Sequence, residues 1–160
     1  MRRTAGRWLA AGLLLALGTV ARADAGAEDW NGFDVSNLAL PPAGLVHGGQ
    51  PRNGIPALTA PKFKPVGEVS MGFEERVVGV VINGLARAYP RAVLVWHEVV
   101  NDRIGGQPFV IVYSPLSGAV ASYRASLDGQ AVEFGVSGLL YNSGTLAFDQ
   151  GSESLWLPVE

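Results

Sequence analysis

Stretches of β-branched and aromatic residues, separated by turns that contain glycine, make up most of the sequence after residue 76. Asn83-Gly84 lies between two such stretches, at 77–82 and 85–89. Asn-Gly in this position is typical of a type I′ β-hairpin, because both central residues need a positive φ. Further strands and turns are expected at 120–127, Asp128-Gly129 and 130–136, at Gly105-Gly106 and 109–113, and over 139–148. This alternation predicts a largely antiparallel β structure.

One segment follows helical spacing instead. Pro90 suits the first position of a helix, and Asn101-Asp102 is expected to end it. The apolar residues that would share one helix face are Ala92, Val95, Trp96, Val99 and Val100. Leu94 lies off this face. If Trp96 is buried at the middle of the face, Trp96→Ala should cost about 3–5 kcal/mol of stability.

Residues 24–70 show neither helical nor strand periodicity. Prolines and glycines interrupt the segment at Pro41-Pro42, Gly48-Gly49, Pro51, Gly54, Pro56, Pro61 and Pro65. It also carries the large apolar residues Trp30, Phe33, Leu38, Leu40, Ile55, Leu58 and Phe63. A solvated linker would not contain these residues, so we expect an ordered, irregular strap laid across the domain. A partner-binding surface would account for the same residues.

Together these patterns predict an α+β fold dominated by β structure. Antiparallel hairpins form a sheet, one amphipathic helix packs on it, and a long irregular N-terminal strap crosses it. The expected division of the chain is 1–23, 24–70 and 71–160, which are a signal peptide, the strap and a β-rich core domain. Residues 24–160 are expected to fold as one unit.

The first 23 residues have the three-part layout of a secretory signal peptide. Arg2, Arg3 and Arg7 precede an apolar run of 13 residues at 8–20, and Ala21-Arg22-Ala23 is a small-x-small cleavage site. A membrane anchor is the alternative, but 13 residues fall short of the roughly 20 that a spanning helix needs. We therefore expect an exported protein, periplasmic or secreted, whose mature chain begins at Asp24 and has no membrane span.

Composition narrows the classes of function. Cleavage after Ala23 removes four of the 12 basic residues and keeps all 14 acidic ones, so the formal charge changes from −2 to −6. An acidic domain has no electrostatic footprint for nucleic acid or anionic lipid, which leaves a small molecule or a protein as the partner. The sequence contains no Cys, which excludes a disulfide framework and a cysteine zinc site.

Three segments carry the candidate site residues. They are Trp96, His97, Glu98, Asn101 and Asp102; Tyr113, Ser114 and Ser117 at the end of a strand; and Tyr141 and Asn142 in a stretch rich in glycine and hydroxyl groups. Sequential elements usually lie side by side, so we expect His97 to face the Ser114–Ser117 turn across a small cavity. Tyr141 or Asn142 would form its third wall. The hydroxyl groups would leave a neutral pocket that holds water or a weakly bound polar ligand.

Several longer motifs resemble a family of exported, mostly bacterial proteins called domain of unknown function 3179. The matching motifs are Asn31-Gly32-Phe33-Asp34, Gly54-Ile55-Pro56-Ala57-Leu58, Pro61-Lys62-Phe63, Asn83-Gly84 with 86–90, Trp96-His97-Glu98 with Val100-Asn101-Asp102, 134–143 and Glu153-Ser154-Leu155-Trp156. They cover nearly all of the expected mature chain. The resemblance implies no assigned activity, as the family name itself states.

The sequence departs from the family pattern in two places. The family typically has Cys-Pro-x-Cys where this chain has Ser114-Pro115-Leu116-Ser117, and its members usually continue well past the Leu-Trp pair. A Cys-x-x-Cys pair at a strand end can bind a soft metal or cycle as a dithiol, whereas serine does neither. The resemblance therefore implies thiol chemistry in relatives that this chain lacks.

A metal site and a hydrolytic site remain open alternatives. His97 and Glu98 are the candidate ligands for a transition metal, with Asp102 and His47 as further ones, although their spacing follows no known ligand pattern. A polar His97 bonded to a backbone carbonyl is the simpler interpretation. Ser114 or Ser117 would need a base such as His97 to act as a nucleophile, and there is no Gly-x-Ser-x-Gly motif around either. A turn at Ser117-Gly118 is the simpler alternative.

Three classes of function follow from these residues. The first is a domain that binds a small ligand or a metal between the His97 helix and the Ser114–Ser117 turn. The second is an enzyme at the same place, and the third is a structural or protein-interaction module in which 135–143 is only a kinked strand with a bulge. We favour the first class, because Trp, His, Asn and Tyr side chains near glycine turns suit an adaptable polar pocket.

Overall fold

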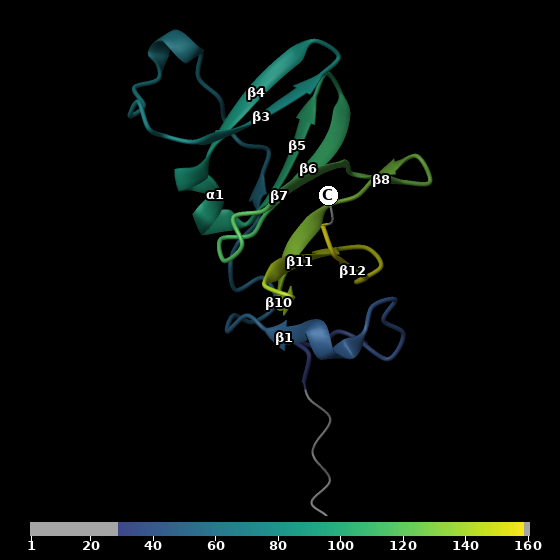
Figure 1. Cartoon of the computed structure of the whole chain (residues 1–160). Coiled ribbons are helices and arrows are strands. Elements are labelled where there is room, and N and C mark those ends of the chain that lie inside the picture. The colour runs from purple at the N-terminus through teal and green to yellow at the C-terminus, as the bar shows by residue number, and fades with distance from the viewer. Residues whose placement is uncertain (1–28, 159–160) are drawn as a thin grey trace, which may run out of the picture.

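The computed structural model describes residues 29–158, and the predicted signal peptide at 1–23 lies outside this range. The fold is α+β and dominated by antiparallel β structure with one α-helix, as the sequence predicts. Within the described range, no helix has both the length and the apolar character needed to cross a membrane. The molecule is elongated, with the β3–β4 hairpin at one end and β1 at the other (Figure 1).

The strands form two four-stranded sheets and two separate hairpins. One sheet has the order β1 (Leu45–His47), β10 (Phe134–Tyr141), β11 (Gly144–Asp149) and β12 (Leu155–Trp156). The other has the order β2 (Leu58–Thr59), β5 (Val99–Ile104), β6 (Gln107–Tyr113) and β7 (Val120–Arg124). The hairpins are β3 (Val77–Ile82) with β4 (Leu85–Pro90), and β8 (Ser126–Leu127) with β9 (Gln130–Ala131). Among the strand pairs of the described residues, only β2–β5 is parallel.

The turns expected from sequence are present. Asn83 and Gly84 have φ values of 52° and 77° and join β3 to β4 in the expected register. Gly105-Gly106 joins β5 to β6 in the same way. Asp128-Gly129 also forms a turn, but the pairing around it extends only from Ser126-Leu127 to Gln130-Ala131. The long hairpin expected there is therefore wrong, because β7 pairs with β6 and β10 pairs with β1 and β11.

Strand β6 lies at the centre of the fold and is buried on both faces. Phe109, Ile111 and Tyr113 pack toward the β3–β4 hairpin and the helix, whereas Val110 and Val112 pack toward β10 and β11. A strand covered on both sides carries apolar residues at consecutive positions, which explains the uninterrupted run at 109–113. The layers are thus the hairpin and helix, the β2–β5–β6–β7 sheet, the β1–β10–β11–β12 sheet and the N-terminal segment.

The segment before residue 71 adds strands to both sheets. β1 pairs with β10, and β2 pairs with β5. The segment also contains two short 3-10 helices, η1 (Pro42–Gly44) and η2 (Val66–Glu68). It approaches β10 closely at Gly138, where φ is +74° and an added Cβ would lie 2.0 Å from the carbonyl oxygen of Gln50. The register of β10 shifts in this region, so the bulge considered from sequence is present.

The helix is shorter than its sequence pattern indicates. α1 spans Arg91–His97 and ends because Glu98 takes a left-handed conformation, with φ of 56°, and donates its N–H to the carbonyl of Leu94. Leu94 is the buried residue of α1, while Trp96 is 75% exposed. The predicted apolar face and the predicted stop at Asn101-Asp102 are therefore wrong. Val99 to Asp102 belong to β5, so two residues of the supposed helix face are strand residues.

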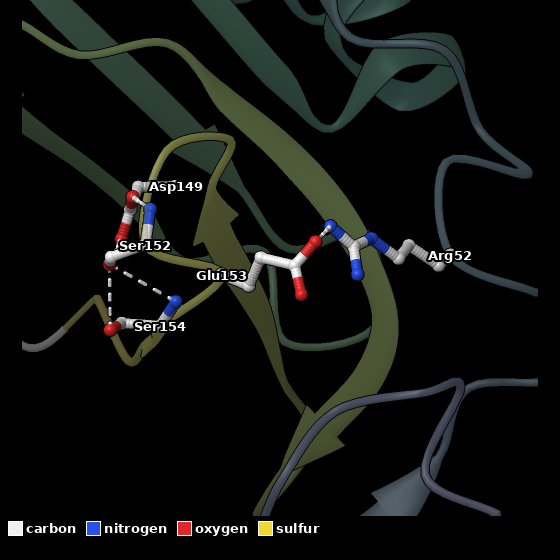
Figure 2. A network of polar contacts seen from close by, with 5 residues as sticks. All are labelled: Arg52, Asp149, Ser152, Glu153 and Ser154. Carbon is white, nitrogen blue, oxygen red and sulfur yellow. Dashed lines mark hydrogen bonds and ion pairs between the residues drawn. The ribbon is translucent and has the colours of Figure 1, made fainter.

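A polar network holds the turn between β11 and β12 (Figure 2). The carboxylate of Asp149 accepts hydrogen bonds from the N–H and the hydroxyl of Ser152, at 2.6 Å each, and from the indole of Trp156 at 3.0 Å. Burial alone would raise the pKa of Asp149, but these donors hold that pKa below its usual value. Glu153 in the same turn pairs with Arg52, which ties the turn to the N-terminal segment.

Candidate functional site

The end of α1 and the end of β6 meet at a cluster that we call the Ser114 corner, made of Glu98, Ser114, Ser143 and Thr145, of which Ser114 and Thr145 are buried. The hydroxyl of Ser114 donates to the carbonyl of Ser143 at 3.0 Å and accepts the N–H of Thr145 at 3.3 Å. The hydroxyl of Thr145 donates to the Glu98 carboxylate at 3.2 Å. The corner thus brings together two of the predicted site residues, Glu98 and Ser114, through two residues that sequence reasoning did not select.

The Glu98 carboxyl has an unusual environment for an acid. Its position at the left-handed end of α1 turns it inward, where it is half-buried. Burial raises the pKa of Glu98 above its usual value, and the hydrogen bond from Thr145 offsets only part of that rise. A raised pKa means that the protonated form, which can donate as well as accept hydrogen bonds, persists to a higher pH than it does for a solvated glutamate.

The cavity beside Ser114 is small. Its volume is about 30 Å³, and Ser114, Thr145, Gly144 and Pro158 are among its walls. This space is of the size of a water molecule and is too small for an organic ligand. In the part of the chain that the structure describes, every buried side-chain nitrogen or oxygen has a hydrogen-bond partner. The buried polar atoms of the corner therefore all have partners within the protein.

His97 makes a contact of its own outside this corner. Its Nδ1 lies 2.8 Å from the carbonyl oxygen of Pro56, and because a carbonyl can only accept, Nδ1 carries the proton. His97 is not among the residues that line the cavity beside Ser114. The simpler interpretation considered for this residue, a hydrogen bond to a backbone carbonyl, is the contact observed.

Ser117 and Tyr113, the other predicted site residues of this segment, make contacts within the fold. Ser117 accepts the N–H of Ala119 at 3.3 Å in a tight turn that is closed by the N–H of Gly118 on the carbonyl of Ser114. Tyr113 is buried in the core, and its N–H donates to the carbonyl of Glu98.

Tyr141 and Asn142 lie beside the N-terminal segment. An added Cβ on Gly44 would come within 3 Å of both side chains, and the N–H of Asn142 donates to the carbonyl of Gly44. Asn142 and Ser143 form the β10–β11 turn, with φ values of 47° and 69°. This turn reaches the Ser114 corner through the carbonyl of Ser143, not through the side chains of Tyr141 or Asn142.

Asn101 joins the two large sheets. Its amide donates to the carbonyl of Phe134 at 2.8 Å and accepts the N–H of Phe134 at 2.9 Å. Asn101 is 8% exposed, so these bonds satisfy both backbone groups of Phe134 away from water. One face of Asn101 and Asp102 also borders a cleft of about 280 Å³ beside Thr59 and Glu133, whose side chains hydrogen-bond to each other.

Asp102 anchors two side chains of the hairpin. Its carboxylate pairs with the guanidinium of Arg87 and accepts the hydroxyl of Tyr89 at 2.7 Å. The side chain of Asp102 is only 6% exposed. Burial and the bond to Asp102 raise the pKa of Tyr89, so the phenol stays protonated and acts as the donor. Asp102 thereby fixes the positions of Arg87 and Tyr89 on β4.

Arg87 and Tyr89 border an open cavity, which we call the hairpin groove. It has a volume of about 930 Å³ and runs between the β3–β4 hairpin, the segment that carries η2, and α1. Its lining residues are Leu58, 61–66, Val69, Met71, 79–81, 86–90, Val93, Leu94 and Val100. These residues are mainly apolar, they include Lys62, Lys64 and Arg87, and they include no Asp or Glu.

Aromatic contacts fix one wall of the hairpin groove. The ring of Phe63 packs edge-on against Tyr89 at 5.4 Å, and the guanidinium of Arg87 lies 4.5 Å from the centre of the Phe63 ring. Much of the lining nevertheless stays open to solvent: Val69, Met71 and Val81 are 41%, 43% and 69% exposed. Within residues 29–158, the groove is an apolar surface that remains accessible to solvent.

Metal-binding residues do not gather in the described part of the chain. Among residues 29–158, no three His, Asp or Glu side chains come close enough to hold a metal ion together. His47 stacks on Trp30 with ring centres 4.9 Å apart, and Asp102 is engaged by Arg87 and Tyr89. The four candidate ligands named from sequence thus lie in separate environments.

Comparison with known proteins identifies a family and nothing further. A family model described as "Protein of unknown function (DUF3179)" matches residues 52–159. No curated protein and no solved structure matches the chain. The matched range contains the Ser114 corner and all residues that line the hairpin groove.

Proposed function

Because the chain belongs to the DUF3179 family of proteins of unknown function, we propose its role from its own cavities: it is a small-ligand-binding domain whose site is the hairpin groove. The observation that carries this proposal is the groove itself, about 930 Å³ in volume, apolar and open to solvent. Ligand sites usually measure about 300–1,000 Å³ and combine apolar walls with a few polar groups. Arg87 and Tyr89, held by Asp102, supply such groups at a fixed position.

At the Ser114 corner we propose only a very small binding space. The predicted site between the His97 helix and the Ser114–Ser117 turn has, at Ser114, space for a water molecule or a similarly small polar species. Among the walls of this space, Ser114 and Thr145 carry hydroxyl groups, which are the side-chain polar contacts available to such an occupant. We do not extend the proposal to a metal ion, because no set of three ligands converges within residues 29–158. With no Cys in the sequence, thiol chemistry is not available to this chain.

We further propose that the protein is exported. The charged start, the apolar run at 8–20 and Ala21-Arg22-Ala23 support this proposal. N-terminal sequencing of the protein from the periplasm or the medium should begin at Asp24. A full-length chain that keeps Met1 and stays in the cytoplasm would contradict export but would leave the binding proposal intact.

Binding in the groove can be tested by filling it. Gly79 lines the groove, has no positive φ, and an added Cβ there would meet no atom within 4 Å. Gly79→Leu should therefore extend into the groove without disturbing the hairpin. Gly72→Leu is the matched control, since Gly72 also has open space around it but does not line the groove.

The probe is N-phenyl-1-naphthylamine, a neutral apolar dye whose fluorescence rises in an apolar site. We expect saturable one-to-one binding to the wild-type protein and to Gly72→Leu, and at least a tenfold weaker affinity for Gly79→Leu. Thermal unfolding of all three proteins shows that each is folded. Equal binding by the two variants, or no saturable binding by the wild-type protein, would contradict the proposed function.

A further inference from the structure

We propose that the hairpin groove selects single-chain amphipathic anions, that is, an alkyl chain that ends in a carboxylate. This inference rests on the proposed function and adds the class of ligand. It follows from two features of the lining, the sign of its charges and the shape of its apolar surface.

The charges on the lining are all positive. Lys62, Lys64 and Arg87 border the groove and no acidic residue does, although the chain as a whole has a formal charge of −2. Arg87 is already paired with Asp102. Lys62 and Lys64 are exposed, and within residues 29–158 neither forms an ion pair. Two free ammonium groups therefore stand at an apolar groove with no counter-charge from the protein.

One wall of the groove carries small side chains. Gly79, Ala86 and Ala88 lie on the outer face of the hairpin and project at most a methyl group. Val69, Met71 and Val93 border the same space from the η2 segment and from α1. A narrow, flexible alkyl chain can lie along such a surface and gain contacts over its whole length. A single terminal anion then places its charge near Lys62 and Lys64.

A free ligand fits these features better than a membrane surface does. The groove is concave, whereas a bilayer presents a flat or convex surface to a protein. A protein with net negative charge is also repelled by an anionic bilayer at long range, while a single bound anion interacts mainly with the lysines within about one Debye length. The occupant we infer is therefore a monomeric ligand.

Displacement of N-phenyl-1-naphthylamine by octanoate, decanoate and dodecanoate measures this preference, with the alcohols of equal chain length as neutral comparisons. All ligands are kept below the concentration at which they form micelles. We expect each carboxylate to bind several-fold more tightly than its alcohol at low salt, and added salt to reduce the difference. Each methylene buried in the groove should raise the affinity by roughly fourfold.

Charge variants test the role of the lysines. The double variant Lys62→Gln, Lys64→Gln should lose most of the preference for carboxylate over alcohol and keep its affinity for the alcohol. The control is Arg103→Gln, Arg124→Gln, which removes the same net charge at residues that do not line the groove and should keep the preference. Thermal unfolding confirms that both proteins are folded.

The outcomes separate the two proposals. If the dye binds in the groove but carboxylates and alcohols compete equally, the ligand class is wrong and the proposed function stands. If carboxylates fail to displace the dye while the protein sediments with vesicles of phosphatidylglycerol and phosphatidylcholine, the surface is a membrane site and the inference is overturned. If the dye does not bind the wild-type protein, the proposed function fails and the inference fails with it.

Discussion

The Ser114 corner and the hairpin groove differ in how much space their residues leave open. In the corner, Glu98, Ser114 and Thr145 bond to one another and to the backbone and leave about 30 Å³ of space. In the groove, apolar residues from three elements surround about 930 Å³ and remain partly exposed. The polar residues that stand out in the sequence form hydrogen bonds with one another and with the backbone. The open surface consists mainly of apolar residues.

The difference has a physical origin in the layers of the fold. The β10–β11 pair is covered on both faces, by β5–β6 on one side and by the N-terminal segment on the other. The β3–β4 hairpin has only two strands, and its inner face, with Val78, Val80 and Ile82, packs on the core around Leu94 and Val100. Its outer face, with Gly79, Val81 and Ala88, has no such cover. An uncovered apolar face next to a concave wall is a surface that a ligand can use.

A pair of glycine variants gives the largest expected contrast. Gly138→Ala should destabilise the protein by about 3–5 kcal/mol, because its Cβ would lie 2.0 Å from a backbone oxygen at a positive φ. Gly79→Ala should be neutral or stabilising, by up to about 1 kcal/mol, since the added methyl group meets no atom and alanine reduces the conformational entropy of the unfolded chain. Urea unfolding measures both. Similar effects at the two positions would contradict the contrast between a locked and an open region.

Two residues of α1 give the next contrast. Leu94 is fully buried at the floor of the groove, so Leu94→Ala should cost about 2–5 kcal/mol. Trp96 is 75% exposed, so Trp96→Ala should cost less than about 1 kcal/mol, in contrast to the cost expected for a buried Trp96. Chemical denaturation compares the two variants. A cost above about 3 kcal/mol for Trp96→Ala would show that the helix packs by the face the sequence pattern suggested.

Asn101 tests whether the conspicuous polar residues are structural. Asn101→Ala should cost about 2–3 kcal/mol, because it leaves the N–H and the carbonyl of Phe134 without partners. The same variant should bind N-phenyl-1-naphthylamine normally, since Asn101 does not line the groove. Denaturation and dye titration on one preparation give both values. Lost dye binding with unchanged stability would place Asn101 in a ligand site instead.

The smallest expected effect is a pH dependence in the Ser114 corner. Burial raises the pKa of Glu98 in the folded state, so the folded protein holds this proton more tightly than the unfolded chain does. Its contribution to stability is complete below the ordinary pKa near 4.5 and is lost as the pH rises through the raised folded value.

The variant Glu98→Gln removes this contribution. Its free energy of unfolding should lack the decline that the wild-type protein shows as the pH rises through this window, whereas Glu74→Gln, at an exposed loop position, should keep it. Urea titrations at several pH values compare the three proteins. An unchanged pH profile in Glu98→Gln would mean that Glu98 is solvated in the folded state.

Local signals were sufficient to predict the turns. Asn83-Gly84, Gly105-Gly106 and Asp128-Gly129 all adopt the positive φ values that their residue types favour. The helix was misread because Glu98 changes the backbone direction within the apolar pattern, and a glutamate in a left-handed conformation gives no signal in the sequence. Val99 and Val100 then fit a helix face as well as a strand that is buried on both sides.

The candidate site was predicted only in part. Glu98 and Ser114 do meet, because β5 and β6 are neighbours joined by a tight turn. Ser143 and Thr145 were missed since their contact with Ser114 spans about 30 residues and depends on how the two sheets pack. The groove gave no signal in the sequence either, because its walls come from separate segments, and the Gly and Ala residues of its hairpin wall resemble any strand surface.

One measurement tests the groove against the corner most directly. A ¹H–¹⁵N correlation spectrum of the labelled protein, titrated with decanoate below its micelle concentration, reports which amides sense the ligand. We predict saturable shifts for Gly79, Ala86 and Ala88 on the hairpin, with Ser117 and Thr145 unchanged. Shifts confined to Ser117, Thr145 and their neighbours, with the hairpin amides unmoved, would contradict the account and return the site to the Ser114 corner.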